Sequence, residues 1–388
     1  MFGISEVCRN NGHDVKCAAP ITTTNRYNQP ENEYYRISTF NQRRLSVLLD
    51  RVTGFQNGFA LLETKKLIRE IDKFSPDILQ LHNIHGSYIN IKMLFNYIKR
   101  KNIKTVWTLH DCWAFTGHCT HFDLINCEQW KTGCHSCPQY KKYPQSIYDN
   151  SKLMYSQKRK LFGDVENMII VTPSCWLKSK VEQSFLNEYE VKVINNGIDL
   201  NTFKPTKSDF RTKYHCENKK IILGVSFVWG YSKGLDVFIE LSKRLPEEYQ
   251  IVLVGTDDVI DSDIPSNIIS IHRTQNAKEL AEIYSTADVF VNPTREDTFP
   301  TVNIEALACG TPVITFNTGG SPEIVNTECA SILEKDDIKT LVNEIIKFSN
   351  ASESLRTICI KRAQEFRSDN KFSEYKKLYE EFCRNKYR

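Results

Sequence analysis

Short apolar runs alternate with longer amphipathic stretches along most of the chain. Runs such as residues 104–109 and 168–172 have the length and the β-branched content of buried strands. Between them, apolar residues recur at helical spacing, as in the stretch 91–98. Regular alternation of strands and helices predicts α/β domains with parallel sheets.

The pattern predicts the following elements. Strands are expected at residues 14–19, 77–81, 104–109, 168–172, 191–195, 220–226, 251–254, 268–271, 289–291 and 312–316. Helices are expected at 1–11, 61–74, 91–98, 151–162, 174–185, 235–244, 300–309 and 341–348, and a last helix carries Phe372, Tyr375, Tyr379 and Phe382 on one stripe. Residues 25–58 are polar and turn-rich, so a loop-rich insertion is expected there.

The chain is too long for a single core. At 388 residues it exceeds the size at which one hydrophobic core stops growing. The turn signal Asn196-Gly197 separates the two series of strands and helices. We therefore expect two Rossmann-like α/β domains, over residues 1–195 and 196–355, and a C-terminal segment 356–388 that packs back on the first domain.

Composition and charge exclude several classes of protein. Lys and Arg number 51 and Asp and Glu 47, a net charge of +4 that is too small to argue for nucleic acid. No stretch is long and apolar enough to span a bilayer, and no leader follows Met1, so a cytoplasmic protein is expected. The basic end with Arg384, Lys386 and Arg388 would favour only weak contact with the inner face of the membrane.

The stretch 289–325 has the features of a ligand-binding edge. A buried strand leads through a polar loop into a helix at Pro300, and a second strand leads through Gly319-Gly320 to Ser321, a candidate cap, and Pro322. Ligands bind beyond the carboxyl ends of parallel strands, and helix N-termini favour phosphate. Carboxylates accept hydrogen bonds from sugar hydroxyls, and two acids, Glu296 and Glu305, flank this helix start. The combination indicates a nucleotide sugar.

The same residues carry a resemblance to a known family. Glu296, Glu305, Ala306, the run 309–313 and Gly319-Gly320 resemble the signature of family 4 retaining glycosyltransferases, which have the two-domain GT-B fold. The resemblance implies that the first acid of an E-x7-E pair lies at the donor sugar and the second binds the ribose. Eight residues separate Glu296 from Glu305, and only Asp297 gives seven, so Glu296 is the preferred sugar contact and Asp297 its rival.

The loop before residue 235 is the expected site of the donor diphosphate. It lacks the G-x-G-x-x-G pattern of dinucleotide sites. The resemblance implies an Arg followed by Lys-Gly; Lys233-Gly234 matches the second part, but residues 226–232 contain no arginine. The phosphate charge must then be met by Lys233, by the amides near Thr301 and Val302, or by another arginine, either Arg273 or Arg295.

Three histidines follow predicted strands in the first domain. PDILQLHNIHG and TVWTLHDCWAFTGHC resemble a subgroup of family 4 from exopolysaccharide and colanic-acid-type pathways. The resemblance implies that His110 acts beside the donor sugar, and it gives His82 and His85 only a cleft-lining role.

A cysteine-rich loop, residues 112–144, carries a C-x2-C pair. Cys119, Cys127, Cys134 and Cys137 have spacing that favours a structural zinc ion, although Cys112, His118, His121 or His135 could replace one ligand. The alternatives are buried apolar cysteines or free thiols, since thiols stay reduced in a leaderless chain. A closed four-ligand site would leave no position for chemistry.

The resemblance, over essentially the whole chain, implies transfer of a sugar from a nucleoside diphosphate donor to a polysaccharide or lipid-linked oligosaccharide, with retention and without a catalytic metal. Front-face attack, with the leaving phosphate assisting the acceptor proton, is favoured over double displacement because no second carboxylate is placed as a nucleophile. A nucleotide-sugar 2-epimerase and a non-catalytic remnant are the alternatives. Because the chain begins inside what resembles the first helix of the fold, the first strand and its loop are expected to be missing, through an internal start at Met1 or truncation with impaired activity.

Overall fold

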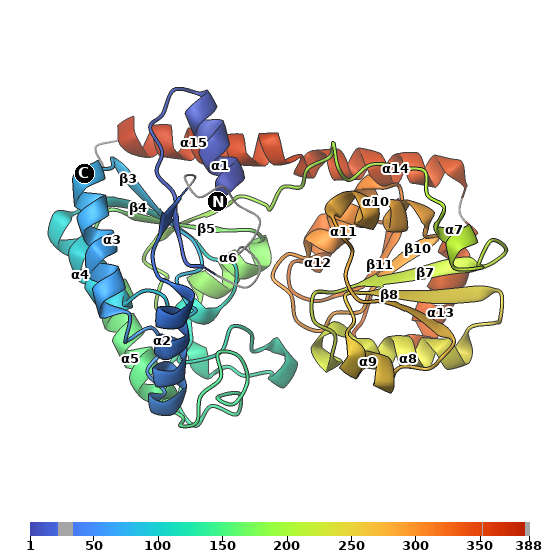
Figure 1. Cartoon of the computed structure of the whole chain (residues 1–388), viewed down its shortest axis with the longest axis horizontal. Coiled ribbons are helices and arrows are strands. Elements are labelled where there is room, and N and C mark those ends of the chain that lie inside the picture. Colours follow the sequence, from blue (N-terminus) through green and yellow to red (C-terminus); the bar gives the residue numbers. More distant parts are fainter. Residues whose placement is uncertain (22–33, 351, 385–388) are drawn as a thin grey trace. The chain divides into compact units, whose positions relative to one another are not determined.

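The computed structural model describes residues 1–21, 34–350 and 352–384. The chain forms two compact units, Met1–Ile194 with Phe372–Arg388, and Asn195–Lys371 (Figure 1). The sequence places the boundary one residue later. It also assigns 356–388 to the first domain, whereas the structure keeps 356–371 in the second unit, because α14 packs on α11.

The first unit is built on a four-stranded parallel sheet in the order β3-β4-β5-β6. A separate pair of short parallel strands, β1 and β2, lies outside it. The elements are α1 (Phe2–Asn10), β1 (Ala18–Ala19), β2 (Tyr35–Arg36), α2 (Phe40–Thr53), α3 (Leu61–Phe74), β3 (Ile78–Leu81), α4 (Ile91–Lys101), β4 (Lys104–Thr108), the 3-10 turns η1 (Trp113–Phe115), η2 (Asp123–Ile125) and η3 (Gln129–Lys131), α5 (Ser151–Phe162), β5 (Met168–Thr172), α6 (Cys175–Glu182) and β6 (Glu190–Val193).

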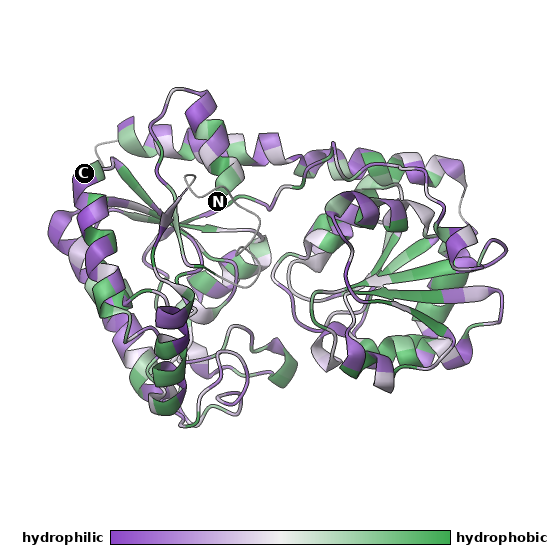
Figure 2. Cartoon of the chain, viewed as in Figure 1, coloured by the Kyte–Doolittle hydropathy of each residue, from purple (hydrophilic) through white to green (hydrophobic). Residues whose placement is uncertain are grey.

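The second unit has a six-stranded parallel sheet in the order β12-β11-β10-β7-β8-β9. Its strands are apolar along most of their length (Figure 2), as expected for a sheet covered on both faces. The elements are α7 (Phe210–Lys213), β7 (Lys220–Val225), η4 (Tyr231–Lys233), α8 (Leu235–Arg244), β8 (Tyr249–Val254), α9 (Asp258–Asp263), β9 (Ile268–Ile271), α10 (Ala277–Thr286), β10 (Val289–Asn292), α11 (Thr301–Ala308), β11 (Val313–Phe316), α12 (Ser321–Ile324), β12 (Ala330–Leu333), α13 (Ile338–Phe348), α14 (Glu353–Ala363) and η5 (Gln364–Phe366).

The last helix, α15 (Ser368–Arg384), packs on the sheet of the first unit. Tyr375 and Phe382 are buried there against Val106 and Val171. The side chain of Lys104 donates to the carbonyl of Phe382 at 2.7 Å, which places a positive charge at the negative end of the helix. The prediction that the C-terminal helix returns to the first domain is confirmed, and the return begins at residue 372.

The expectation of a loop-rich insertion over residues 25–58 is wrong for its second half. Residues 22–33 lie outside the described residues, but Phe40–Thr53 form the helix α2. Thr39 and Gln42 make a capping box, and Gly54 ends the helix with a left-handed φ of 72°. Leu45, Leu48 and Val52 recur at helical spacing in this stretch, so the periodic signal for α2 was present among the polar residues.

Two smaller expectations also differ from the structure. The strand predicted at residues 14–19 is reduced to Ala18–Ala19, since only this segment has a partner strand to pair with. Ser321 does not cap α12, because the helix begins at Ser321 itself and Gly320 takes the capping position. Among the described residues, no helix is long and apolar enough to cross a membrane.

Candidate functional site

The loop between β10 and α11 places the carboxylate of Asp297 and the backbone of Glu296 beside Lys233. The ammonium of Lys233 donates to a carboxylate oxygen of Asp297 at 2.7 Å and to the backbone carbonyl of Glu296 at 3.0 Å. The hydroxyl of Thr294 lies 3.4 Å from the same nitrogen. Side chains from the β7–α8 loop and the β10–α11 loop therefore meet at the carboxyl edge of the sheet, where α11 begins.

Gly234 and Gly319 allow this close approach. Gly234 has a φ of 74°, and a Cβ there would lie 2.6 Å from the backbone oxygen of Pro293. Gly319 has a φ of 54°, and a Cβ there would lie 1.6 Å from the carbonyl oxygen of Asp297. The predicted residue Gly319 thus brings the turn before α12 against the acid-bearing loop, whereas Gly320, with a φ of −89°, needs no such freedom.

Glu305 lies on α11, one helical turn after Thr301 and Val302. The hydroxyl of Tyr284, on α10, donates to its carboxylate at 3.1 Å. Burial raises the pKa of Glu305 to about 7, and hydrogen bonds from Tyr284 and Thr301 only partly oppose this rise. A carboxyl with this pKa changes charge near neutral pH.

Arg295 is held by the protein itself. Its guanidinium donates to both carboxylate oxygens of Asp236 at 2.8 Å and to Asp336 at 2.6 and 2.9 Å. It also lies over the ring of Tyr231, 4.0 Å from the ring centre, and its side chain is 4% exposed. Arg295 therefore ties the loops of the site together and is not presented to a phosphate. The other candidate, Arg273, is exposed and lies over the ring of Phe227.

In the first unit, three histidines gather where β3 and β4 end. Nδ1 of His82 and Nε2 of His110 are 3.2 Å apart. Burial lowers the pKa of His110 to about 4 and that of His82 well below its usual value, so both rings are neutral. The second ring nitrogen of His82 is buried without a hydrogen-bond partner in the part of the chain that the structure describes.

His85 has a different environment. Its Nε2 lies 2.7 Å from a carboxylate oxygen of Asp111, and its Nδ1 lies 3.3 Å from the hydroxyl of Tyr143. Although burial acts to raise the pKa of Asp111, the charge and hydrogen bond of His85 hold it below the usual value, so this carboxyl is ionised. An ionised Asp111 can only accept, so Nε2 of His85 carries the proton of this contact.

The family resemblance implied only a cleft-lining role for His85, and the structure adds its two partners. Asp111 directly follows His110 in the chain, so the pair His110-Asp111 was visible as a motif. Tyr143 comes from the far end of the cysteine-rich loop, and its contact with His85 depends on how that loop folds. No local pattern in the sequence would have found it.

The four predicted zinc ligands share one neighbourhood without forming a site. The thiols of Cys119 and Cys137 are hydrogen-bonded to each other, which lowers the pKa of Cys137 to about 7. The sulfur of Cys134 accepts from the backbone N–H of Gly117 at 3.1 Å, and Cys127 is half-buried. Among the described residues, no three His, Cys, Asp or Glu side chains are placed so that they could hold a metal ion. These cysteines are therefore not arranged as ligands in this structure, and the zinc ion stays a prediction.

Lys158 of α5 holds the base of the same loop. It is fully buried, donates to the carbonyls of Trp113 and Thr116 at 2.8 and 3.1 Å, and lies over the ring of Trp113. Burial lowers the pKa of its ammonium to about 7. This contact fixes the chain directly after His110 and Asp111.

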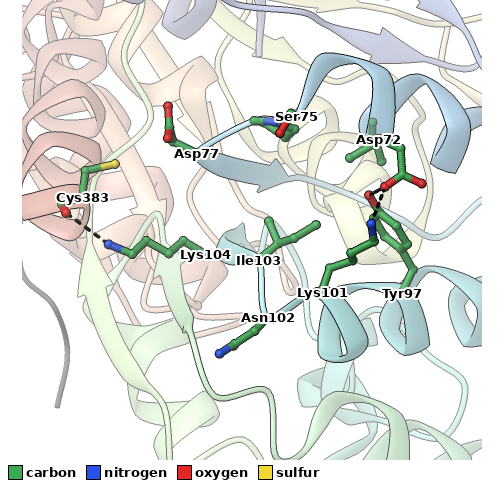
Figure 3. Close-up of a pocket in the computed structure, with 11 residues that line it drawn as sticks. Asp72, Ser75, Asp77, Tyr97, Lys101, Asn102, Ile103, Lys104 and Cys383 are labelled. Atoms are coloured by element: carbon green, nitrogen blue, oxygen red, sulfur yellow. Dashed lines mark hydrogen bonds and ion pairs between the residues drawn. The ribbon is translucent and has the colours of Figure 1, made fainter.

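A hollow of about 420 Å³ lies at the opposite, amino edge of β3 and β4 (Figure 3). Lys101 pairs with Asp72 at 3.0 Å, and Tyr97 donates to the same carboxylate. Lys104 donates to the carbonyls at the end of α15. The charges that line it hold α4 and α15 in place, and none of the predicted site residues lies there.

Comparison with known proteins decides the family. Residues 2–202 match the model of Glycosyltransferase Family 4, and residues 206–366 match that of Glycosyl transferases group 1. The chain belongs to glycosyltransferase family 4. Its two parallel-sheet units have the GT-B fold, as expected from the resemblance.

Two curated relatives are named for the biosynthesis of colanic acid and of a capsular polysaccharide. The putative colanic acid biosynthesis glycosyl transferase WcaC of Escherichia coli is 26% identical over 69% of this chain and 66% of its own length. The capsular polysaccharide biosynthesis glycosyltransferase CapM of Staphylococcus aureus is 30% identical over 53% of this chain and 57% of its own. The chain spans 52 to 66% of the length of the first curated relatives it matches.

A solved structure shares the fold of this family 4 chain. HepE from Anabaena, in complex with UDP-glucose, has a TM-score of 0.59 at 15% identity and covers 82% of each chain.

Proposed function

We propose that this family 4 protein transfers a sugar from a nucleoside diphosphate sugar to a hydroxyl of a polysaccharide or a lipid-linked oligosaccharide, with retention at the transferred carbon. The observation that carries this proposal is the convergence of Lys233, the start of α11 and Glu305 at one sheet edge. The names of WcaC and CapM support the acceptor class, and the UDP-glucose complex of HepE supports the donor class.

In this proposal the diphosphate binds between Lys233 and the amides of Thr301 and Val302. A lysine and a helix N-terminus supply fixed positive charge for the leaving diphosphate, which is the role a divalent metal ion plays in other transferases. Without the donor, Lys233 forms an ion pair with Asp297. Binding therefore releases Asp297, which with Glu296 is then available to the hydroxyls of the sugar.

Glu305 receives the ribose in the same arrangement. A ribose hydroxyl donates to an ionised carboxylate, so binding favours the deprotonated form of a group whose pKa is about 7. The turn Gly319-Gly320 completes the edge, because it is the backbone that lies against Asp297.

On the first unit, we assign His110 to the donor sugar and His85 to the acceptor. Nδ1 of His85 lies 3.3 Å from the Tyr143 hydroxyl, and in this proposal it accepts a hydrogen bond from an acceptor hydroxyl that binds in that place. Asp111 fixes the ring and its tautomer. The hydroxyl attacks the anomeric carbon as the bond to the diphosphate breaks, and its proton passes to the leaving phosphate oxygen on the same face.

A donor screen followed by a transfer assay tests the proposal. A nucleoside diphosphate sugar at about 100 times its dissociation constant should stabilise the protein by about 2.7 kcal/mol in a thermal melt. The stabilising donor should then give a glycosylated product whose new linkage keeps the anomeric configuration, as read by NMR. Stabilisation by no donor, an inverted linkage, or epimerisation of the donor without acceptor would overturn the proposal.

A further inference from the structure

Helix α2 is amphipathic, but its polar side faces the protein and its apolar side faces outward. Its inward side buries Ser46 and Asp50, while Leu45, Leu48 and Val52 on the outward side are 59, 56 and 43% exposed. The carboxylate of Asp50 accepts from the backbone N–H of Asn57, so the polar inner side is fixed by hydrogen bonds. A helix on the surface of a globular protein normally turns its apolar stripe to the core. The stripe of α2 has no such partner inside this unit.

The loop after the cysteine-rich region extends this apolar surface. Ile147 and Tyr148 are 57 and 62% exposed. The backbone N–H of Ile147 donates to the carbonyl of Arg51 at 2.8 Å, which holds the loop against the end of α2. We call the surface formed by Leu45, Leu48, Val52, Ile147 and Tyr148 the α2 face.

Positive charges border the α2 face. Arg44 and Arg51 on α2 are exposed, and within the described residues neither forms an ion pair. The carboxylate of α2 itself, Asp50, is turned inward. Lys141 and Lys142 are exposed on the loop that carries Ile147 and Tyr148, and Asp149 is the exposed acid beside them. Apolar side chains bordered by cations are the pattern of a helix that lies in a membrane interface.

We propose that the α2 face docks the protein on the surface of an anionic lipid bilayer. The leucines and valine would enter the boundary between headgroups and acyl chains, and the arginines would pair with lipid phosphates. A second copy of this chain fits the charges less well, because a two-fold contact centred on α2 would bring Arg44 and Arg51 of both copies together. The site in the second unit plays no part in this docking.

Vesicle flotation of the purified full chain tests the proposal, with no donor or acceptor present. The protein should float with phosphatidylcholine vesicles that contain about 30 mol% phosphatidylglycerol, and not with pure phosphatidylcholine vesicles. Leu45→Ser/Leu48→Ser/Val52→Ser should reduce vesicle binding at least about tenfold, because the apolar side chains that would contact the acyl chains are removed. Arg44→Glu/Arg51→Glu should reduce it by more than roughly 30-fold, since each arginine near such a surface contributes a factor of about five and the substitution also reverses its charge.

Val259→Ser is the matched control, because Val259 is 69% exposed on α9 of the other unit. It should float like the parent, and all variants should melt like the parent, since the altered side chains are exposed. Absence of parent binding to anionic vesicles, or equal binding by the α2 variants and the control, would overturn the proposal. So would a dimer in sedimentation velocity that the α2 variants dissociate while vesicles bind nothing. Because no sugar is transferred in this experiment, its failure leaves the proposed transferase activity untouched.

Discussion

The carboxyl edges of the two parallel sheets carry opposite kinds of chemistry. In the second unit, the edge is made of charges: Lys233 on Asp297, and Arg295 between Asp236 and Asp336. In the first unit, buried and neutral imidazoles dominate, with one ionised carboxylate, Asp111, held against His85. A charged edge suits a diphosphate, and a neutral edge with an oriented ring nitrogen suits a hydroxyl. In the proposed function, the same strand and helix arrangement binds two kinds of ligand, and the loops make the difference.

The largest effect should come from removing the cation of the charged edge. Lys233→Ala should weaken donor binding at least about 100-fold, because one charge-assisted contact to the diphosphate is lost and Asp297 stays unpaired beside it. Isothermal titration with the donor found in the screen measures this. Lys243→Ala, on the exposed side of α8, is the control and should bind normally. Equal binding by both variants would show that the charged edge is not the donor site.

The neutral edge should respond in turnover and less in donor affinity. His85→Ala and His110→Ala should each lower kcat about 100-fold, a typical loss for a group that positions or exchanges a proton. Donor binding should change little in either variant. Asp111→Asn is the sharper probe of His85, because it keeps the shape and removes the charge that sets the tautomer. If kcat is unchanged in the two histidine variants, these rings are structural.

Glu305→Gln should bind the donor poorly and yet be more stable than the parent above neutral pH. The pKa of Glu305 is raised to about 7 by burial, so the folded state binds its proton more tightly than the unfolded state does. Stability is therefore lost as pH rises from the unfolded pKa through about 7, and glutamine carries no such cost. Melts at pH 8 should favour the variant by roughly 3 kcal/mol, and the difference should vanish near pH 4. A variant less stable than the parent at pH 8 would contradict this pKa.

The smallest effect concerns the loop that carries Tyr143. We predict one structural zinc ion per chain at Cys119, Cys127, Cys134 and Cys137, although their thiols are not placed as ligands here. Elemental analysis of protein purified without chelator should find it, and chelation should loosen the loop 112–144 before the rest of the unit. Zinc-free protein would show that these cysteines serve only as buried side chains and free thiols.

Local patterns predicted most of the fold, and one helix with a clear local pattern, α2, was not predicted. The bounds of α3, α5, α8, β5 and β9 match the expected ranges, because each has an apolar face or run that the sheet covers. Helix α2 was missed because the polar residues of 25–58 were read as a loop, although Leu45, Leu48 and Val52 recur at helical spacing. Its capping box, Thr39 with Gln42, and Gly54 at its end were further local signals of a helix.

The sequence by itself determined the two α/β units, the edge that carries the candidate residues, and the family. These follow from periodicity, from turn residues and from a motif within one stretch of chain. Only the tertiary structure decided the partners: Arg295 is held by Asp236 and Asp336, Lys233 by Asp297, and His85 by Asp111 and Tyr143. Most of these partners lie on different loops, and their distances are set by how strands pair and helices pack. For that reason the residue types could be read from the chain. Their charge states, and which of them are already bound by other side chains, could not.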